Sequence, residues 1–108
     1  MSEHIHEFKQ AVNMTAIELE KWLSTNESKG VGQHIEGSSE AIGHVSGRHI
    51  AEILRKNGST YSEADEEQMK RTASYVKRHL AQRPDGNVRE THWRYSLMNW
   101  GNDPLKGE

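Results

Sequence analysis

The chain has 108 residues, a length that fits one small domain, and it contains no cysteine, which excludes disulfides, thiolate metal sites and cysteine nucleophiles. Hydrophobic residues make up 32 % of it and the net charge is -2, a balance that predicts a modest core with mobile segments. No stretch approaches the roughly 18 apolar residues of a membrane span, and no leader pattern is present. We therefore expect a cytoplasmic protein with no membrane partner.

Two helices are expected in the first quarter of the chain. Apolar residues spaced three and four apart over 5–12 predict a helix of about ten residues. Thr15, followed three residues later by Glu18, forms a capping box that predicts a second helix over 16–25. Residues 26–43 then contain four of the nine glycines without any sustained period, so we expect a long flexible loop that is either functional or a linker.

Apolar spacing after residue 44 predicts a third helix of about ten residues, with Ser46 as its N-cap and Gly58 near its end. A helix that begins there would offer free amides beside Gly47 and Arg48. Free helix-start amides, a glycine and a guanidinium are groups that bind phosphate. The sequence thus suggests a phosphate contact at the start of this helix.

The longest helix is expected from Ser62, its N-cap, to about Gln82, with an acidic first turn and an apolar seam spaced by three and four. Residues 83–87 form a turn. A last short helix follows Thr91, and we expect Trp93 and Trp100 to anchor the core. These elements predict an all-α fold: one domain over 1–108, a bundle of about five helices with a mobile N-terminus, the 26–43 loop and a C-terminal tail.

Basic residues concentrate after residue 41, whereas the N-terminal part is acidic; residues 68–108 carry eight Lys or Arg against four acids. Such clustering on helices, with aromatic residues interleaved, is typical of a nucleic-acid surface, although a charged helix face is often only solvated. The candidate contact residues are Arg48, Arg55, Lys56, Lys70, Arg71, Lys77, Arg78, Arg89, Arg94 and Tyr95.

Motifs for catalysis are missing from the sequence. The seven histidines lack a shared helical face or cysteine partners at metal-ligand spacing, so we expect no metal and no cofactor. No nucleophile and base occur at role-specific spacing. We therefore predict that the protein is not an enzyme and has no catalytic residues.

Four blocks of the sequence resemble a microbial family of small domains of unknown function whose members are often labelled DNA-binding protein. These blocks are VNMTAIELEKWL, AIGHVSGRHIAEILRK, VKRHLAQRP and THWRYSLMNWGNDPLK. The resemblance runs from about Phe8 to Lys106. It implies a single-domain protein that associates with DNA, and it brings no catalytic residues.

Two hypotheses follow. The first is a non-enzymatic DNA-binding domain that contacts phosphates through a basic helical face. The second is a protein-interaction or stress-associated adaptor, in which the acidic N-terminal part and the basic C-terminal part meet a protein partner, a second copy or each other.

Overall fold

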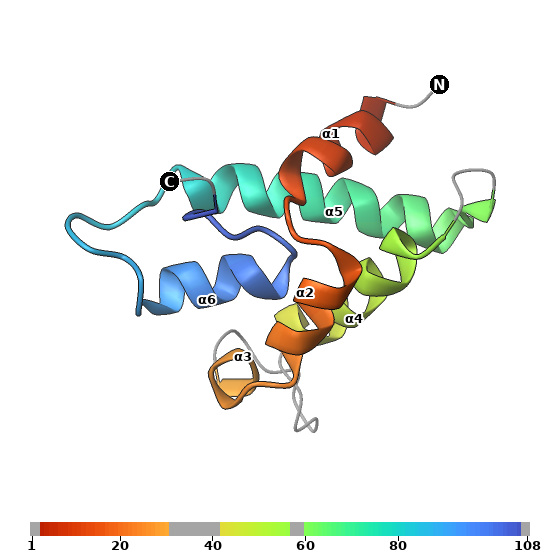
Figure 1. Ribbon diagram of the computed structural model, residues 1–108. Coiled ribbons are helices and arrows are strands. Elements are labelled where there is room, and N and C mark those ends of the chain that lie inside the picture. Colours follow the sequence, from red (N-terminus) through yellow and green to blue (C-terminus); the bar gives the residue numbers. More distant parts are fainter. Residues whose placement is uncertain (1–2, 31–41, 57–59, 107–108) are drawn as a thin grey trace.

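The computed structural model describes residues 3–30, 42–56 and 60–106, and these residues form helices and no β-strand (Figure 1). The all-α prediction is confirmed, with six helices described where about five were expected. They are α1 (Glu3–Ala11), α2 (Ala16–Leu23), α3 (Asn26–Gly30), α4 (Ile42–Leu54), α5 (Glu63–Leu80) and α6 (His92–Asn99).

Three helices begin where their predicted caps place them. The Thr15 hydroxyl accepts a hydrogen bond from the Glu18 amide at 3.2 Å, and the Glu18 carboxylate accepts from the Thr15 amide at 2.8 Å. Ser62 and Asp65 form the same reciprocal pair at the start of α5. Thr91 caps α6. Each cap satisfies amides that the helix itself leaves unpaired.

The start of α4 differs from the prediction. This helix begins at Ile42, so Ser46 lies inside it, buried, and the expected N-cap at Ser46 is wrong. The first part of the expected loop also differs, because residues 26–30 form α3. Residues 31–41 of that loop and Gly58 lie outside the described residues.

Helix α5 crosses the middle of the fold, with α1 on one side and α4 and α6 on the other (Figure 1). Helices α2 and α4 pack against each other. Trp93 and Trp100 are 7 % and 8 % exposed, which confirms them as core anchors. The largest fully buried apolar side chains are Phe8, Leu19, Ile50, Ile53, Met69, Val76, Val88 and Leu97.

A buried polar residue, Asn99, joins three helices at the end of α6. Its side-chain oxygen accepts hydrogen bonds from Trp22 Nε1 at 2.7 Å and from Ser28 Oγ at 2.6 Å. Its amide nitrogen donates to the Ser28 carbonyl at 3.1 Å. All of these groups are paired within the protein, so Asn99 fixes the positions of α2 and α3 against α6.

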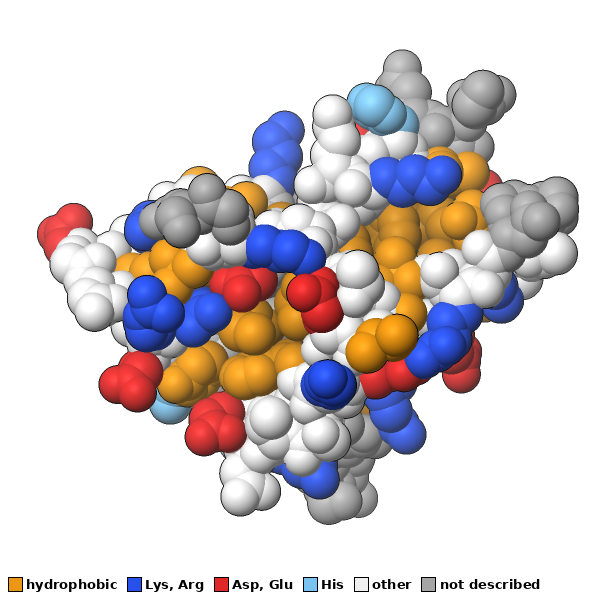
Figure 2. Space-filling model, in the orientation of Figure 1, with side chains coloured by type: hydrophobic (Ala, Val, Ile, Leu, Met, Phe, Trp, Pro, Cys, Tyr) orange, Lys and Arg blue, Asp and Glu red, His pale blue; other side chains and the backbone are white. Residues whose placement is uncertain are grey.

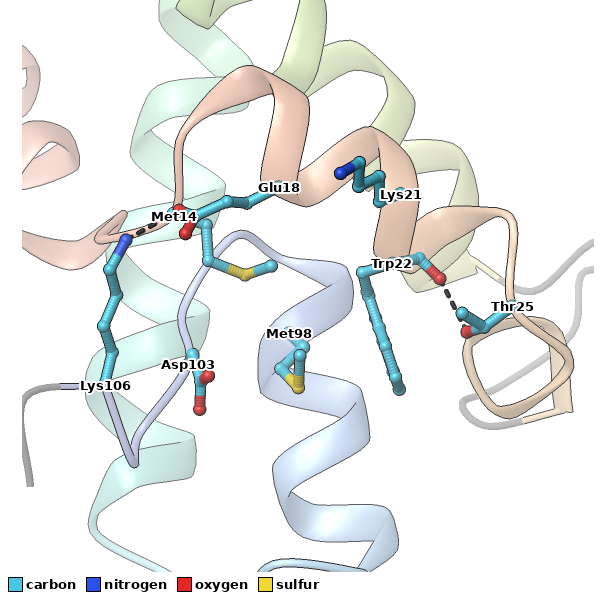
Figure 3. A pocket seen from close by; sticks show the side chains of 8 residues that line it. All are labelled: Met14, Glu18, Lys21, Trp22, Thr25, Met98, Asp103 and Lys106. Carbon is cyan, nitrogen blue, oxygen red and sulfur yellow. Dashed lines mark hydrogen bonds and ion pairs between the residues drawn. The ribbon is translucent and has the colours of Figure 1, made fainter.

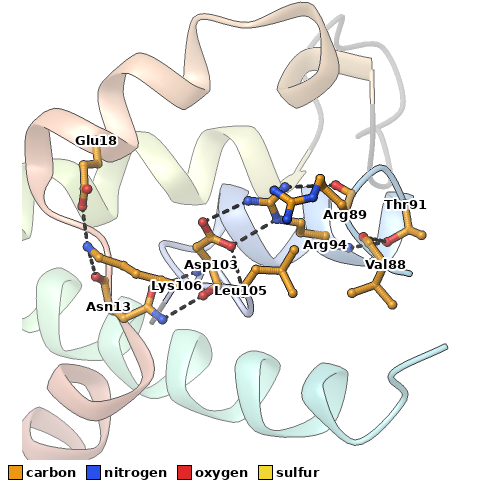
Figure 4. Close-up of polar contacts among 9 residues, drawn as sticks. All are labelled: Asn13, Glu18, Val88, Arg89, Thr91, Arg94, Asp103, Leu105 and Lys106. Carbon is orange, nitrogen blue, oxygen red and sulfur yellow. Dashed lines mark hydrogen bonds and ion pairs between the residues drawn. The ribbon is translucent and has the colours of Figure 1, made fainter. Parts of the chain in front are cut away.

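The segment after α6 is fastened to the linker between α1 and α2 (Figure 4). The Asn13 side chain donates to the Asp103 carbonyl at 2.9 Å and accepts from the Asp103 amide at 2.8 Å. The Met14 amide donates to the Gly101 carbonyl, and Lys106 Nζ donates to the Asn13 carbonyl at 2.7 Å. Two of the sequence blocks that resemble the family therefore contact each other directly.

Candidate nucleic-acid interface

Four of the ten candidate contact residues lie together on the outer face of α5. At 100° per residue, an α-helix places Lys70, Arg71, Lys77 and Arg78 within an arc of about 120°. All four are exposed. Within the described ranges, none of the four forms an ion pair with an acidic side chain. We call these residues the α5 basic face.

Two other candidates, at the end of α4, are ion-paired. Arg55 forks onto the Glu20 carboxylate of α2, with Nε 2.8 Å from Oε2 and the second contact from Nη2 to Oε1. The hydrogen bond from Arg55 lowers the pKa of Glu20. Lys56 Nζ lies 2.5 Å from Oδ2 of Asp65. The charges of Arg55 and Lys56 are therefore largely compensated inside the molecule.

Asp65 is the acidic centre of the junction between α4 and α5, and it is 2 % exposed. Burial alone would raise its pKa, but hydrogen bonds from Lys56, the Ser62 amide and His49 outweigh burial and lower it. His49 Nε2 lies 2.8 Å from Oδ1. Asp65 is thus held as a carboxylate, and Lys56 stabilises the junction between α4 and α5 by pairing with it.

Arg94 and Tyr95 also face structural partners. Arg94 forms two 3.1 Å contacts with the Asp103 carboxylate and donates to the Arg89 carbonyl at 3.0 Å (Figure 4). Tyr95 lies against the ring of Trp22, with 5.3 Å between centroids. Arg94 therefore holds the segment after α6, and Tyr95 lies at the α2–α6 contact. Arg89 is exposed between α5 and α6.

The third predicted helix does not begin at Ser46, so the free amides that were expected to bind phosphate there are absent. Ser46, Gly47 and Arg48 lie one turn inside α4, where backbone amides are hydrogen-bonded along the helix. A Cβ at Gly47 would lie 2.3 Å from the Asn99 carbonyl oxygen. Gly47 therefore allows α4 to approach α6 closely, whereas Arg48 is exposed.

A pocket of about 300 Å³ opens beside the α5 basic face. Tyr75 stacks on Trp100 with centroids 4.3 Å apart and on His79 at 5.0 Å, which makes one wall aromatic. No pattern in the sequence indicates Tyr75 or Ser74 as site residues, although both lie within five residues of Lys70 on one helix. The residues that line this α5 pocket are Lys70, Arg71, Ser74, Tyr75, Arg78 and Trp100.

His79 continues the aromatic stack toward Trp93. The two rings lie 6.4 Å apart, and Trp93 Nε1 donates to the His79 carbonyl at 2.7 Å. Burial lowers the pKa of His79, and the backbone of Trp93 near its ring opposes this shift. Its Nε2 is buried without a hydrogen-bond partner in the described structure. His79 is therefore a neutral packing residue, outside the α5 pocket.

A second pocket, of about 360 Å³, lies between α2 and α6 and is largely apolar. Figure 3 shows Met14, Trp22 and Met98 around it, with the Lys106–Glu18 ion pair of 2.6 Å at its edge. Figure 2 shows hydrophobic side chains gathered on this face among charged ones. We call it the α2–α6 pocket.

In the described parts, no group of three or more His, Cys, Asp or Glu side chains could hold a metal ion. No described helix combines the length and apolar character that crossing a membrane requires.

The fold and these surfaces define a small all-α protein whose longest described helix carries four exposed cations on one face. The model of the family described as "Protein of unknown function (DUF3140)" matches residues 7–98, and the chain belongs to this family. No curated protein matches the chain, and no solved structure matches it.

Proposed function

We propose that the protein is a non-enzymatic DNA-binding domain that contacts the phosphate backbone through the α5 basic face. The proposal depends on one observation: some of the candidate cations form ion pairs with carboxylates of the protein, and others do not. Arg55, Lys56 and Arg94 are held by carboxylates within the molecule, whereas the four cations of α5 have no carboxylate partner among the described residues. Unpaired cations on one helix form a local positive potential that attracts a polyanion.

The sequence hypothesis includes nine basic contact residues, whereas this proposal includes four. The two therefore predict different salt dependences of DNA affinity. Each neutralised phosphate contributes about -0.9 to the slope of log affinity against log salt concentration for duplex DNA. Four contacts predict a slope of about -3 to -4, whereas contacts by all nine basic candidates would give about -8. Fluorescence anisotropy with a labelled duplex over a salt series measures this slope.

Substitutions of single cations or pairs of cations test which of them contact DNA. The double substitution Lys77→Gln/Arg78→Gln should weaken binding to unrelated duplex sequences equally and should reduce the slope by about 2. Arg55→Gln is the matched control, because it removes a cation that Glu20 already holds, so DNA affinity should stay close to wild type. Equal losses in both variants, or no binding at low salt, would contradict the proposal.

A second candidate function, protein interaction, is favoured by the α2–α6 pocket. Its walls include Met14, Met98 and Trp22, and Ile17 on α2 is 61 % exposed. Methionine-rich apolar surfaces adapt to protein partners. Light scattering on the same samples distinguishes the candidates: self-association without DNA binding would support this second function.

A further inference from the structure

The α5 pocket differs from the rest of the α5 basic face because it is concave. Ser74 lies one turn from Lys70 and one turn from Arg78 on α5, so these three side chains share one side of the helix. Trp100, at the end of α6, also lines the hollow and stacks on Tyr75. Lys77 lies on the same helix but does not line the hollow, which makes it a matched cation outside the pocket.

The aromatic wall of the pocket is held in place by other parts of the fold. Trp100 is 8 % exposed and stacks on Tyr75 with an angle of 16° between the ring planes. Burial raises the pKa of Tyr75, and the neighbouring Ser96 side chain on α6 opposes this shift. Because Tyr75 is already stacked on Trp100 and His79, it supplies a fixed wall to the pocket. Preorganised walls lower the entropic cost of holding a ligand.

The polar groups of the pocket all suit an anion. Its lining includes three cations, the hydroxyls of Ser74 and Tyr75, and no carboxylate. Arg78 Nε donates to the Ser74 carbonyl at 3.3 Å, which leaves the terminal guanidinium nitrogens to form a fork. A guanidinium fork matches two oxygens of a phosphate, and lysine and serine add further donors. Three like charges around one hollow repel each other until an anion enters.

We propose that the α5 pocket is a phosphate subsite, with Arg78 as the fork and Lys70, Arg71 and Ser74 as additional donors. The inference rests on the proposed DNA-binding function and specifies its contact. A terminal phosphomonoester carries a charge of about -1.5 to -2 at neutral pH, whereas a phosphodiester carries about -1. The end of a strand can also enter a hollow that a continuous backbone passes over. The subsite therefore prefers a terminal phosphate to an internal one.

The test compares two short single-stranded DNA oligonucleotides of the same sequence, one with a 5′-phosphate and one without. Both carry a fluorophore at the 3′ end, and anisotropy measures their affinities for wild type, Arg78→Gln and Lys77→Gln. Wild type should bind the phosphorylated strand about five- to tenfold more tightly. Arg78→Gln should abolish this ratio, whereas Lys77→Gln should weaken both strands and keep the ratio.

Two outcomes separate this inference from the function on which it rests. Equal affinity for both strands in wild type would overturn the terminal preference. If, in addition, Arg78→Gln and Lys77→Gln weaken binding equally, the subsite is wrong while DNA binding stands. No binding of either strand at low salt would overturn both. Arg78→Lys, which keeps the charge without the fork, should retain only part of the ratio, and circular dichroism confirms that each variant is folded.

Discussion

Asn99 shows how one residue fixes several elements at once. Its side chain is 1 % exposed, yet all its polar atoms are paired with Trp22 and Ser28. The network joins residues 71 and 77 positions apart, so no local pattern in the sequence indicates it. A buried asparagine in this setting specifies one arrangement of the helices, since any other arrangement would leave its groups unpaired.

Removing this side chain should therefore destabilise the protein. Asn99→Ala leaves Trp22 Nε1 and Ser28 Oγ without their acceptor, which should lower the free energy of unfolding by about 2–3 kcal/mol. Urea denaturation followed by tryptophan fluorescence measures the loss. Asn87→Ala is the control, because Asn87 is exposed and its side chain bonds only within its own turn. Equal stability of the two variants would contradict the assigned role.

At the scale of elements, capping residues in the sequence predicted three helix starts correctly. The start of α4 was predicted wrongly, because contacts with distant parts of the chain extend this helix. Thr15, Ser62 and Thr91 each bond an amide three residues ahead, so the sequence itself holds the necessary information. Ser46 is a similar candidate N-cap, but α4 packs against α2 and α6 and continues through this position. The sequence predicted that the four cations of α5 lie together, because their spacing on one helix is enough to place them on one face.

The partners of the other cations could not be read from the sequence. Arg55 and Glu20 are 35 residues apart, and only the packing of α4 on α2 brings them together. Arg94 and Asp103 meet because the segment after α6 turns back. The aromatic wall of the α5 pocket likewise depends on the position of Trp100 relative to α5. These ion pairs and the pocket depend on contacts between distant parts of the chain, so the sequence alone does not indicate them.

The close approach of α4 to its neighbours depends on Gly47. A Cβ there would lie 2.3 Å from the Asn99 carbonyl oxygen and 2.7 Å from Leu23 Cδ2. Gly47→Ala should lower stability by roughly 1–3 kcal/mol, because this clash outweighs the gain of about 1 kcal/mol in helix propensity. Gly30→Ala, where no atom lies within 4 Å of the added Cβ, should be neutral or stabilising in the same thermal melt. A Gly47→Ala protein as stable as wild type would show that the helices can separate without penalty.

At the scale of the whole molecule, stability should depend on pH through two groups, the half-buried His79 and the buried Asp65. The pKa of His79 is lowered from 6.5 by burial, so the unfolded chain binds this proton more readily than the folded protein. Stability should therefore be full above about pH 7 and fall as the pH drops below 6.5. The pKa of Asp65 is lowered from 3.8, so its contribution is lost only as the pH falls below that value.

Urea titrations at several pH values test the first of these losses. His79→Gln removes the titrating ring, and the fall in unfolding free energy between about pH 7 and pH 5 should become shallower. His92→Gln is the control, because His92 is exposed and should leave the wild-type dependence in place. An unchanged slope in His79→Gln would show that other groups cause the acid sensitivity.

The contact between Asn13 and Asp103 has a consequence for how the chain matures during translation. Asn13 and Met14 leave the ribosome early, but their partners, Gly101, Asp103 and Lys106, are made about ninety residues later. Until then the linker between α1 and α2 lacks the bonds that fix its direction. Long-range contacts of this kind form late because the intervening chain must first be closed into a loop. The nascent chain can therefore form α2 and its cap early, but it completes the fold only when the segment after α6 has been synthesised.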